Sequence, residues 1–231
     1  MNSSTHKVLG RSCIAMRRAA FGAVSAASLA LAGAACAAIF ATNPTGPPYT
    51  FATESDGTRF TVGASSIEVT RLGIWDEGGD GLNASFTVGI YRVSDQALLG
   101  SVVVPSGTAA TLDSGTRWTD LGTPLTLTAG ADYVVATRRA DTSDTFHRAD
   151  DPGQWTIAAG VTADNGVFAA SDPGVLTYPN IPLANNGLLG PNFDFTPVPE
   201  PAGWAGIAAM LLPVVGALFH RHCRRLIRSS E

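Results

Sequence analysis

Residues 85–93 read SFTVGIYRV, with large apolar side chains at positions 86, 88 and 90. Thr87, Gly89 and Tyr91 occupy the positions next to them. A period of two is typical of a half-buried β-strand, because successive side chains of a strand point to opposite faces of its sheet. This stretch therefore predicts a strand with one face toward a core.

Similar runs recur along the middle of the chain, separated by turn residues, and no stretch there has helical periodicity. These patterns predict an all-β fold with two packed antiparallel sheets, either a β-sandwich or a jelly roll. Polar, turn-rich segments at 141–153 and 180–192 predict long loops. Further strands are expected at 58–64, 66–76, 98–105, 116–121, 124–129, 132–139 and 154–159, with weaker patterns at 175–179 and 193–198.

Charge is distributed unevenly along the 231 residues. The middle, residues 42–198, carries seven arginines, no lysine and 17 acidic residues, which leaves a net formal charge of −10. Such a surface repels phosphate backbones and argues against a nucleic-acid partner. The three cysteines, Cys13, Cys36 and Cys223, all lie outside this middle part, so the domain has no disulfide framework.

An apolar, small-residue run from Ala19 to Ile39 follows Arg17 and Arg18. A basic start, an apolar centre and a small-residue end are the three parts of a secretory signal peptide. We therefore expect a signal peptide at residues 1–41, with cleavage around Ala35 to Ala41. A retained membrane helix is the alternative, whereas lipid attachment at Cys36 is disfavoured because Gly33 stands where a bulky aliphatic residue is usual.

A second apolar run, Ala202 to Phe219, contains 18 residues without a charge. As a helix it would rise about 27 Å, which just matches a bilayer core. Pro213 inside it is tolerated in membrane helices. The arginines that follow should remain cytoplasmic, which places residues 42–197 on the extracytoplasmic side of the membrane. A buried C-terminal helix of the domain is the alternative. These arginines are Arg221, Arg224, Arg225 and Arg228.

Directly before this run stands the tetrapeptide Val198, Pro199, Glu200 and Pro201. A Pro-Glu-Pro motif, an apolar span (202–219) and an arginine-rich tail (220–231) resemble the PEP-CTERM sorting signal of Gram-negative bacteria, here residues 198–231. The resemblance implies export, transient membrane tethering and processing by an exosortase near the motif. It also implies a place at the cell surface or outside cells that produce exopolysaccharide.

The middle of the chain, residues 42–197, is also similar to β-sandwich domains that precede this sorting signal. The similarity lies in LGIWDEGGDGL (72–82), VGIYRVSDQALLGSVVVP (88–105) and LTLTAGADYVVA (125–136). It implies a fold and no particular activity.

The acidic segment 76–83, DEGGDGLN, places Asp76, Asp80 and Asn83 around three glycines. Hard cations prefer several oxygen ligands, so these three residues are a candidate calcium site. The segment is not an EF-hand loop, because Gly78 and Thr87 stand where that loop needs oxygen ligands. A plain acidic hairpin turn is the alternative.

No catalytic constellation stands out in residues 42–198. His147 is the sole histidine there, and no serine lies in a GxSxG motif. Tryptophans and tyrosines at 75, 91, 118, 155 and 178 could form an aromatic platform for sugars. We expect a non-enzymatic surface or matrix protein that binds exopolysaccharide and needs no cofactor apart from the candidate calcium. The alternatives are a secreted hydrolase with a carboxylate pair acting on polysaccharide and a plain C-terminally anchored membrane protein.

Overall fold

The computed structural model describes residues 36–49, 54–138, 143–169 and 174–199. Several predicted segments therefore lie outside the described residues. They are most of the signal peptide, Glu200 and Pro201 of the sorting motif, the apolar span 202–219 and the basic tail. Within those described, no helix is long and apolar enough to cross a membrane.

The first large sheet has five antiparallel strands in the order β1-β16-β5-β9-β8. Its centre is β5, which pairs along its whole length with β16 on one side and with β9 on the other. The strands are β1 (Ala38–Ile39), β16 (Pro191–Pro197), β5 (Ile67–Trp75), β9 (Thr116–Leu127) and β8 (Thr111–Asp113).

The second large sheet has six antiparallel strands in the order β14-β13-β4-β10-β6-β7. It contains the stretch quoted first, which forms β6 (Phe86–Arg92) with Phe86, Val88 and Ile90 buried. The other strands are β14 (Ile181–Pro182), β13 (Val161–Phe168), β4 (Ser55–Val62), β10 (Asp132–Arg138) and β7 (Leu98–Val104).

Two smaller sheets and one helical turn complete the described part. One small sheet consists of β15 (Leu188–Leu189), β11 (Phe146–Arg148) and β3 (Pro48–Tyr49), and the other of β12 (Thr156–Ile157) and β2 (Ala41–Thr42). A 3-10 turn, η1, spans Glu77–Gly79.

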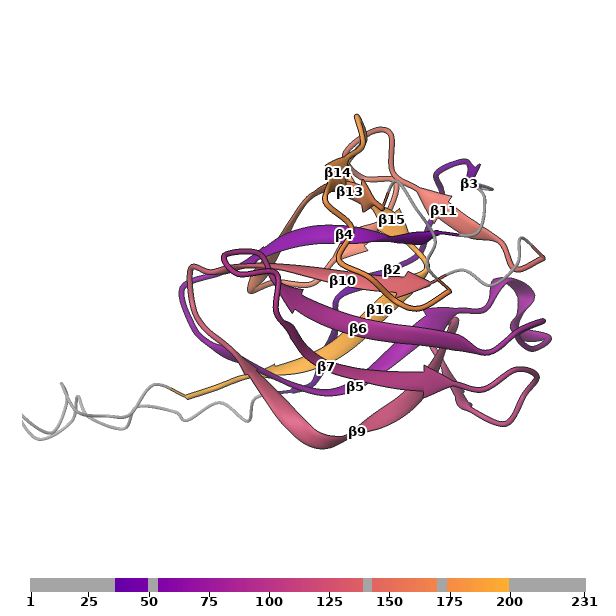
Figure 1. Ribbon diagram of the computed structural model, residues 1–231, viewed down its shortest axis with the longest axis horizontal. Coiled ribbons are helices and arrows are strands. Elements are labelled where there is room, and N and C mark those ends of the chain that lie inside the picture. The colour runs from indigo at the N-terminus through magenta and orange to yellow at the C-terminus, as the bar shows by residue number, and fades with distance from the viewer. Residues whose placement is uncertain (1–35, 50–53, 139–142, 170–173, 200–231) are drawn as a thin grey trace, which may run out of the picture. The chain divides into compact units, whose positions relative to one another are not determined.

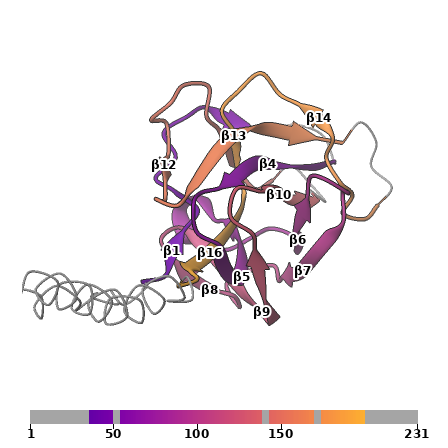
Figure 2. The same ribbon diagram turned by 90° about the vertical axis from the view of Figure 1, so that its left-hand side faces the viewer.

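The two large sheets pack face to face around one hydrophobic core, as in a β-sandwich (Figures 1 and 2). The ring of Phe60 on β4 lies 4.8 Å, centroid to centroid, from that of Phe193 on β16. Phe40 stacks on the same Phe193 ring at 4.8 Å and is completely buried. Aromatic rings from both sheets thus hold the two layers together. The predicted all-β, antiparallel fold is confirmed.

The strand predictions differ from the structure in several places. The two strands expected at 116–121 and 124–129 are one long strand, β9. The pattern at 175–179 forms no strand, and 154–159 contains only the two residues of β12. The eight-residue strand β13 was not predicted, and the expected loops 141–153 and 180–192 contain the short strands β11, β14 and β15.

The chain enters and leaves this domain side by side. Ala38 pairs with Phe195 and Ile39 with Asp194, so β1 lies along β16, as Figure 2 also shows. Residues 38–41 lie within the fold, because β1, the buried Phe40 and the start of β2 are there. The predicted signal peptide, 1–41, therefore overlaps the folded domain by these residues.

Candidate functional site

A second, smaller hydrophobic cluster covers the outer face of the six-stranded sheet. Four of its residues come from β6, β10 and β13, and two of the residues packed against them, Leu176 and Tyr178, come from the segment that begins at Gly174. The face of the sheet that points away from the core is therefore partly apolar. The cluster consists of Tyr91, Val134, Ala136 and Val167, with Val93, Leu176 and Tyr178 packed against it.

Residues 174–178, the covering segment, are held on this face by specific contacts. The Tyr91 hydroxyl donates a hydrogen bond to the carbonyl of Leu176 at 3.2 Å. The backbone N–H of Thr177 donates to the buried Ser55 hydroxyl at 3.0 Å, and the Tyr178 ring meets the Tyr91 ring edge-on at 5.6 Å. Burial raises the pKa of the Tyr91 phenol, which therefore stays neutral and able to donate.

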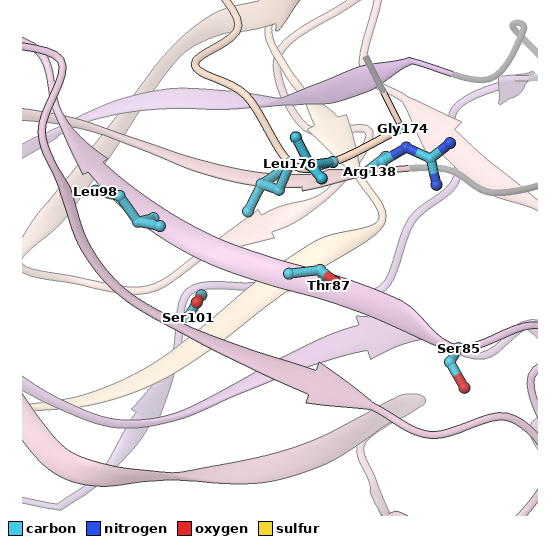
Figure 3. Close-up of a pocket in the computed structure, with 8 residues that line it drawn as sticks. Ser85, Thr87, Leu98, Ser101, Arg138, Gly174 and Leu176 are labelled. Carbon is cyan, nitrogen blue, oxygen red and sulfur yellow. The ribbon is translucent and has the colours of Figure 1, made fainter. Parts of the chain in front are cut away.

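A pocket of about 310 Å³ opens beside the covering segment. Hydroxyl groups from β6, β7 and the loop before β6 line it together with apolar side chains and one guanidinium. Figure 3 shows Leu98 at one end of the pocket and Ser85 at the other. The lining residues are Ser85, Thr87, Leu98, Ser101, Arg138, Gly174, Val175 and Leu176.

Exposed apolar residues gather at this pocket. Of the four large apolar side chains that are exposed in the described residues, Leu98 and Val175 line the pocket. A third, Val103, lies opposite the lining residue Thr87 in the β6/β7 ladder, so the two side chains share a face. These three side chains are between 46% and 61% exposed. Clustered exposed apolar surface marks binding sites more often than isolated residues do.

Gly89 on β6 lies beneath two leucines that line the pocket, Leu98 and Leu176. A Cβ atom on Gly89 would lie 2.8 Å from Cδ1 of Leu98 and 2.9 Å from Cδ2 of Leu176. Both contacts are shorter than side chains normally allow. Gly89 therefore lets the two leucines approach the sheet and shape the pocket, a relationship that the strand pattern alone could not reveal.

A charged group lies on the same outer face, where β4, β10 and β13 are adjacent. Arg59 forms ion pairs with Asp132 at 2.5 Å and Asp164 at 3.7 Å, and the Thr61 hydroxyl lies 2.8 Å from Asp132 and 3.2 Å from Asp164. Hydrogen bonds from Arg59 and Thr61 lower the pKa of Asp132. Burial raises the pKa of Asp164, and the neighbouring Asp132 charge adds to this increase. Of these two neighbouring carboxylates, Asp132 thus has a pKa below its ordinary value and Asp164 a pKa above it.

The candidate calcium residues make different contacts. The buried Asp76 carboxylate pairs with Nε of Arg117 at 2.7 Å and accepts the backbone N–H of Gly81. The Asn83 side chain donates to Asp144 at 3.1 Å, while Asp80 is exposed. A protein cation, the Arg117 guanidinium, thus already neutralises the central carboxylate. In the described part of the chain no group of three or more His, Cys, Asp or Glu is placed to hold a metal, and calcium binding here stays a prediction.

The aromatic residues do not form one platform. Trp118 lies under the Arg71 guanidinium, which is 4.7 Å from its ring centre, on the five-stranded sheet. Trp155 packs edge-on against Phe40 in the core, and only Tyr91 and Tyr178 meet on the outer face of the six-stranded sheet.

His147 lies between two acceptors. Its Nδ1 is 2.9 Å from the carbonyl of Gly46, and its Nε2 is 2.9 Å from the Glu77 carboxylate. Trp75 also donates to that carboxylate, at 2.7 Å, and its ring meets the imidazole edge-on. With both ring nitrogens engaged by these groups, His147 has the role of a structural bridge between β11, η1 and the residues before β3.

The predicted sorting motif begins where the last strand, β16, ends. The backbone N–H of Val198 donates to the carbonyl of Ser66 at 2.8 Å, and Pro199, the next residue, is exposed.

Comparison of the chain with protein-family models and with curated proteins gave no match.

Proposed function

We propose that this protein is exported from a Gram-negative bacterium, sorted through its C-terminal signal, and binds exopolysaccharide with the outer face of its six-stranded sheet. The observation that carries the binding part is the clustering of exposed Leu98, Val103 and Val175 around a pocket lined by hydroxyl groups. A binding pocket typically combines apolar walls with a few polar groups that fix orientation. Sugar residues present apolar C–H faces and hydroxyl edges, which match this lining.

Charge supports the choice of partner. The net formal charge of −10 over residues 42–198 disfavours polyanions with dense phosphate, such as nucleic acids. A sugar polymer of low charge density does not meet this repulsion, so polysaccharide is the better match among extracellular polymers.

Glycan binding tests the proposal directly. The purified mature protein should bind to an array of bacterial polysaccharides, and the double variant Leu98→Ser with Val175→Ser should lose binding. Both side chains are exposed, so the variant should keep its melting temperature. The matched control is Leu112→Ser, an exposed leucine on β8 of the other sheet, which should bind like the wild type. Equal binding by the double variant would place any sugar site elsewhere.

Sorting needs a separate test. We expect Glu200→Ala to trap a full-length, membrane-bound form, because the resemblance implies that an exosortase processes the chain near the Pro-Glu-Pro motif. Mass measurement of protein from medium and from membranes decides this. Mature wild-type protein that still carries residues 204–228 would indicate a plain C-terminal membrane anchor.

A hydrolase acting on polysaccharide is the second candidate function. It is favoured by Asp132 and Asp164, since a carboxylate with a lowered pKa and one with a raised pKa suit the nucleophile and the acid of glycoside hydrolysis. Release of reducing ends by wild-type protein, abolished by Asp164→Asn, would support it. Binding without release supports the non-enzymatic proposal.

A further inference from the structure

Phe40 and its neighbours constrain where the leader of this chain can be removed. The Phe40 side chain has no solvent exposure and contacts Phe60 at 5.3 Å, Phe193 at 4.8 Å and Trp155 at 6.2 Å, measured between ring centroids. These partners come from both large sheets and from the residues before β12. Phe40 is therefore a central residue of the core, and we expect it to remain in the mature protein.

The backbone of Phe40 and Ala41 is also fixed in the fold, by hydrogen bonds. The Phe40 N–H donates to the carbonyl of Phe193, and the Phe40 carbonyl accepts the N–H of Ala158. The buried Asn192 side chain bonds both the N–H and the carbonyl of Ala41. Removal of residues 38–41 would leave these buried polar groups without partners and open a cavity of aromatic size, and each loss is strongly destabilising.

The sequence before this segment offers a cleavage motif that avoids such damage. Ala35 and Ala37 have the small-x-small spacing that a signal peptidase requires, with cleavage after the second small residue. Cys36 and Ala37 are exposed, whereas Ala38 is the first residue paired to β16. The motif therefore ends where the ordered pairing of the domain begins.

We infer that the leader is cleaved between Ala37 and Ala38, so that β1 becomes the N-terminus of the mature domain. This inference rests on the export proposed above. It excludes the later small-residue position, Ala41, as a cleavage site, because cleavage there would remove Phe40 from the core.

The test expresses the full chain in a Gram-negative host and determines the start of the mature protein by intact mass and N-terminal sequencing. The expected start is Ala38. Ala37→Leu places a bulky side chain in the peptidase pocket and should abolish this form. The matched control Ala34→Leu makes the same change in the same apolar run, outside the two recognised positions, and should leave the form beginning at Ala38 unchanged.

Other outcomes overturn the inference in distinguishable ways. A mature start at Thr42, or at any position other than Ala38, refutes the cleavage site and leaves the proposed export intact. Protein that still carries residues 19–37 refutes both. Phe40→Ala supplies an independent readout: the exported variant should melt well below Val175→Ala, a truncation of an exposed side chain, and equal melting temperatures would remove the structural premise.

Discussion

Arg117 and Asp76 form an ion pair inside the domain, 2.7 Å apart, with side chains only 5% and 2% exposed. The same guanidinium donates to the carbonyls of Thr108, Ala110 and Gly79. One arginine on β9 therefore organises the acidic turn after β5 and the loop before β8.

Arg117→Leu should destabilise the domain by about 3–5 kcal/mol, because it leaves the Asp76 carboxylate buried and unpaired. Denaturant unfolding of the purified protein measures this. The control is Arg148→Ala, which breaks an exposed pair with Asp150 and should cost less than about 1 kcal/mol. A similar decrease in the free energy of unfolding for the two variants would mean that the buried pair stabilises the domain no more than the exposed one.

Glu77→Gln should alter the dependence of stability on pH. Hydrogen bonds from Trp75 and then His147 lower the pKa of Glu77 from its ordinary 4.5. A depressed pKa stabilises the folded state above 4.5, and this contribution disappears as the pH falls through the lowered value. The unfolding free energies of wild type and variant should thus differ at pH 7, by less than about 1 kcal/mol because Glu77 is half exposed, and converge in acid. A difference that stays constant from pH 7 into acid would contradict this prediction.

Gly187→Ala should be destabilising through two separable effects. Gly187 has a φ of 140°, and an added Cβ would lie 2.1 Å from the Trp155 ring. Gly78 also has a positive φ, 83°, but nothing within 4 Å of an added Cβ. Gly78→Ala therefore measures backbone strain alone, of order 1 kcal/mol, and Gly187→Ala should exceed it by the cost of overpacking, typically 1–3 kcal/mol. Equal thermal shifts would show that Trp155 moves freely.

Calcium at the acidic turn can be tested through Asp80. If the turn binds calcium, millimolar calcium raises the melting temperature, because a ligand bound only by the folded state stabilises it. We expect Asp80→Asn to lose that increase. Asp80 is the informative position, since a change at Asp76 would also break the pair with Arg117. Identical melting curves with calcium and with a chelator would remove the calcium prediction.

The sequence predicts this fold where alternation is regular and fails where backbone irregularities interrupt it. β6 follows the apolar pattern of residues 86–90 and was predicted almost to its ends. β13 was missed because Asp164, Asn165 and Gly166 look like a turn, yet they lie at a bulge where the register with β4 shifts. β9 was predicted as two strands because Gly122 and Pro124 look like a break.

The candidate site could not be predicted because its parts are far apart in the sequence. The pocket combines Thr87 of β6 with Val175 of the covering segment, and neither has a distinctive local pattern. The Arg117–Asp76 pair joins residues 41 positions apart. The sequence of the acidic turn alone therefore does not show that Arg117 of β9 pairs with its central carboxylate.

The pairing of β1 with β16 makes the domain suitable for circular permutation. Because Ala38 lies opposite Phe195, a short linker could join the two ends of the domain without crossing its core. New ends could then be opened in the exposed turn Ser94–Gln96 between β6 and β7. A permuted domain that folds would keep the pocket face but would have its two former ends joined, without the leader or the tail. Binding by the domain could then be measured independently of the export of the chain.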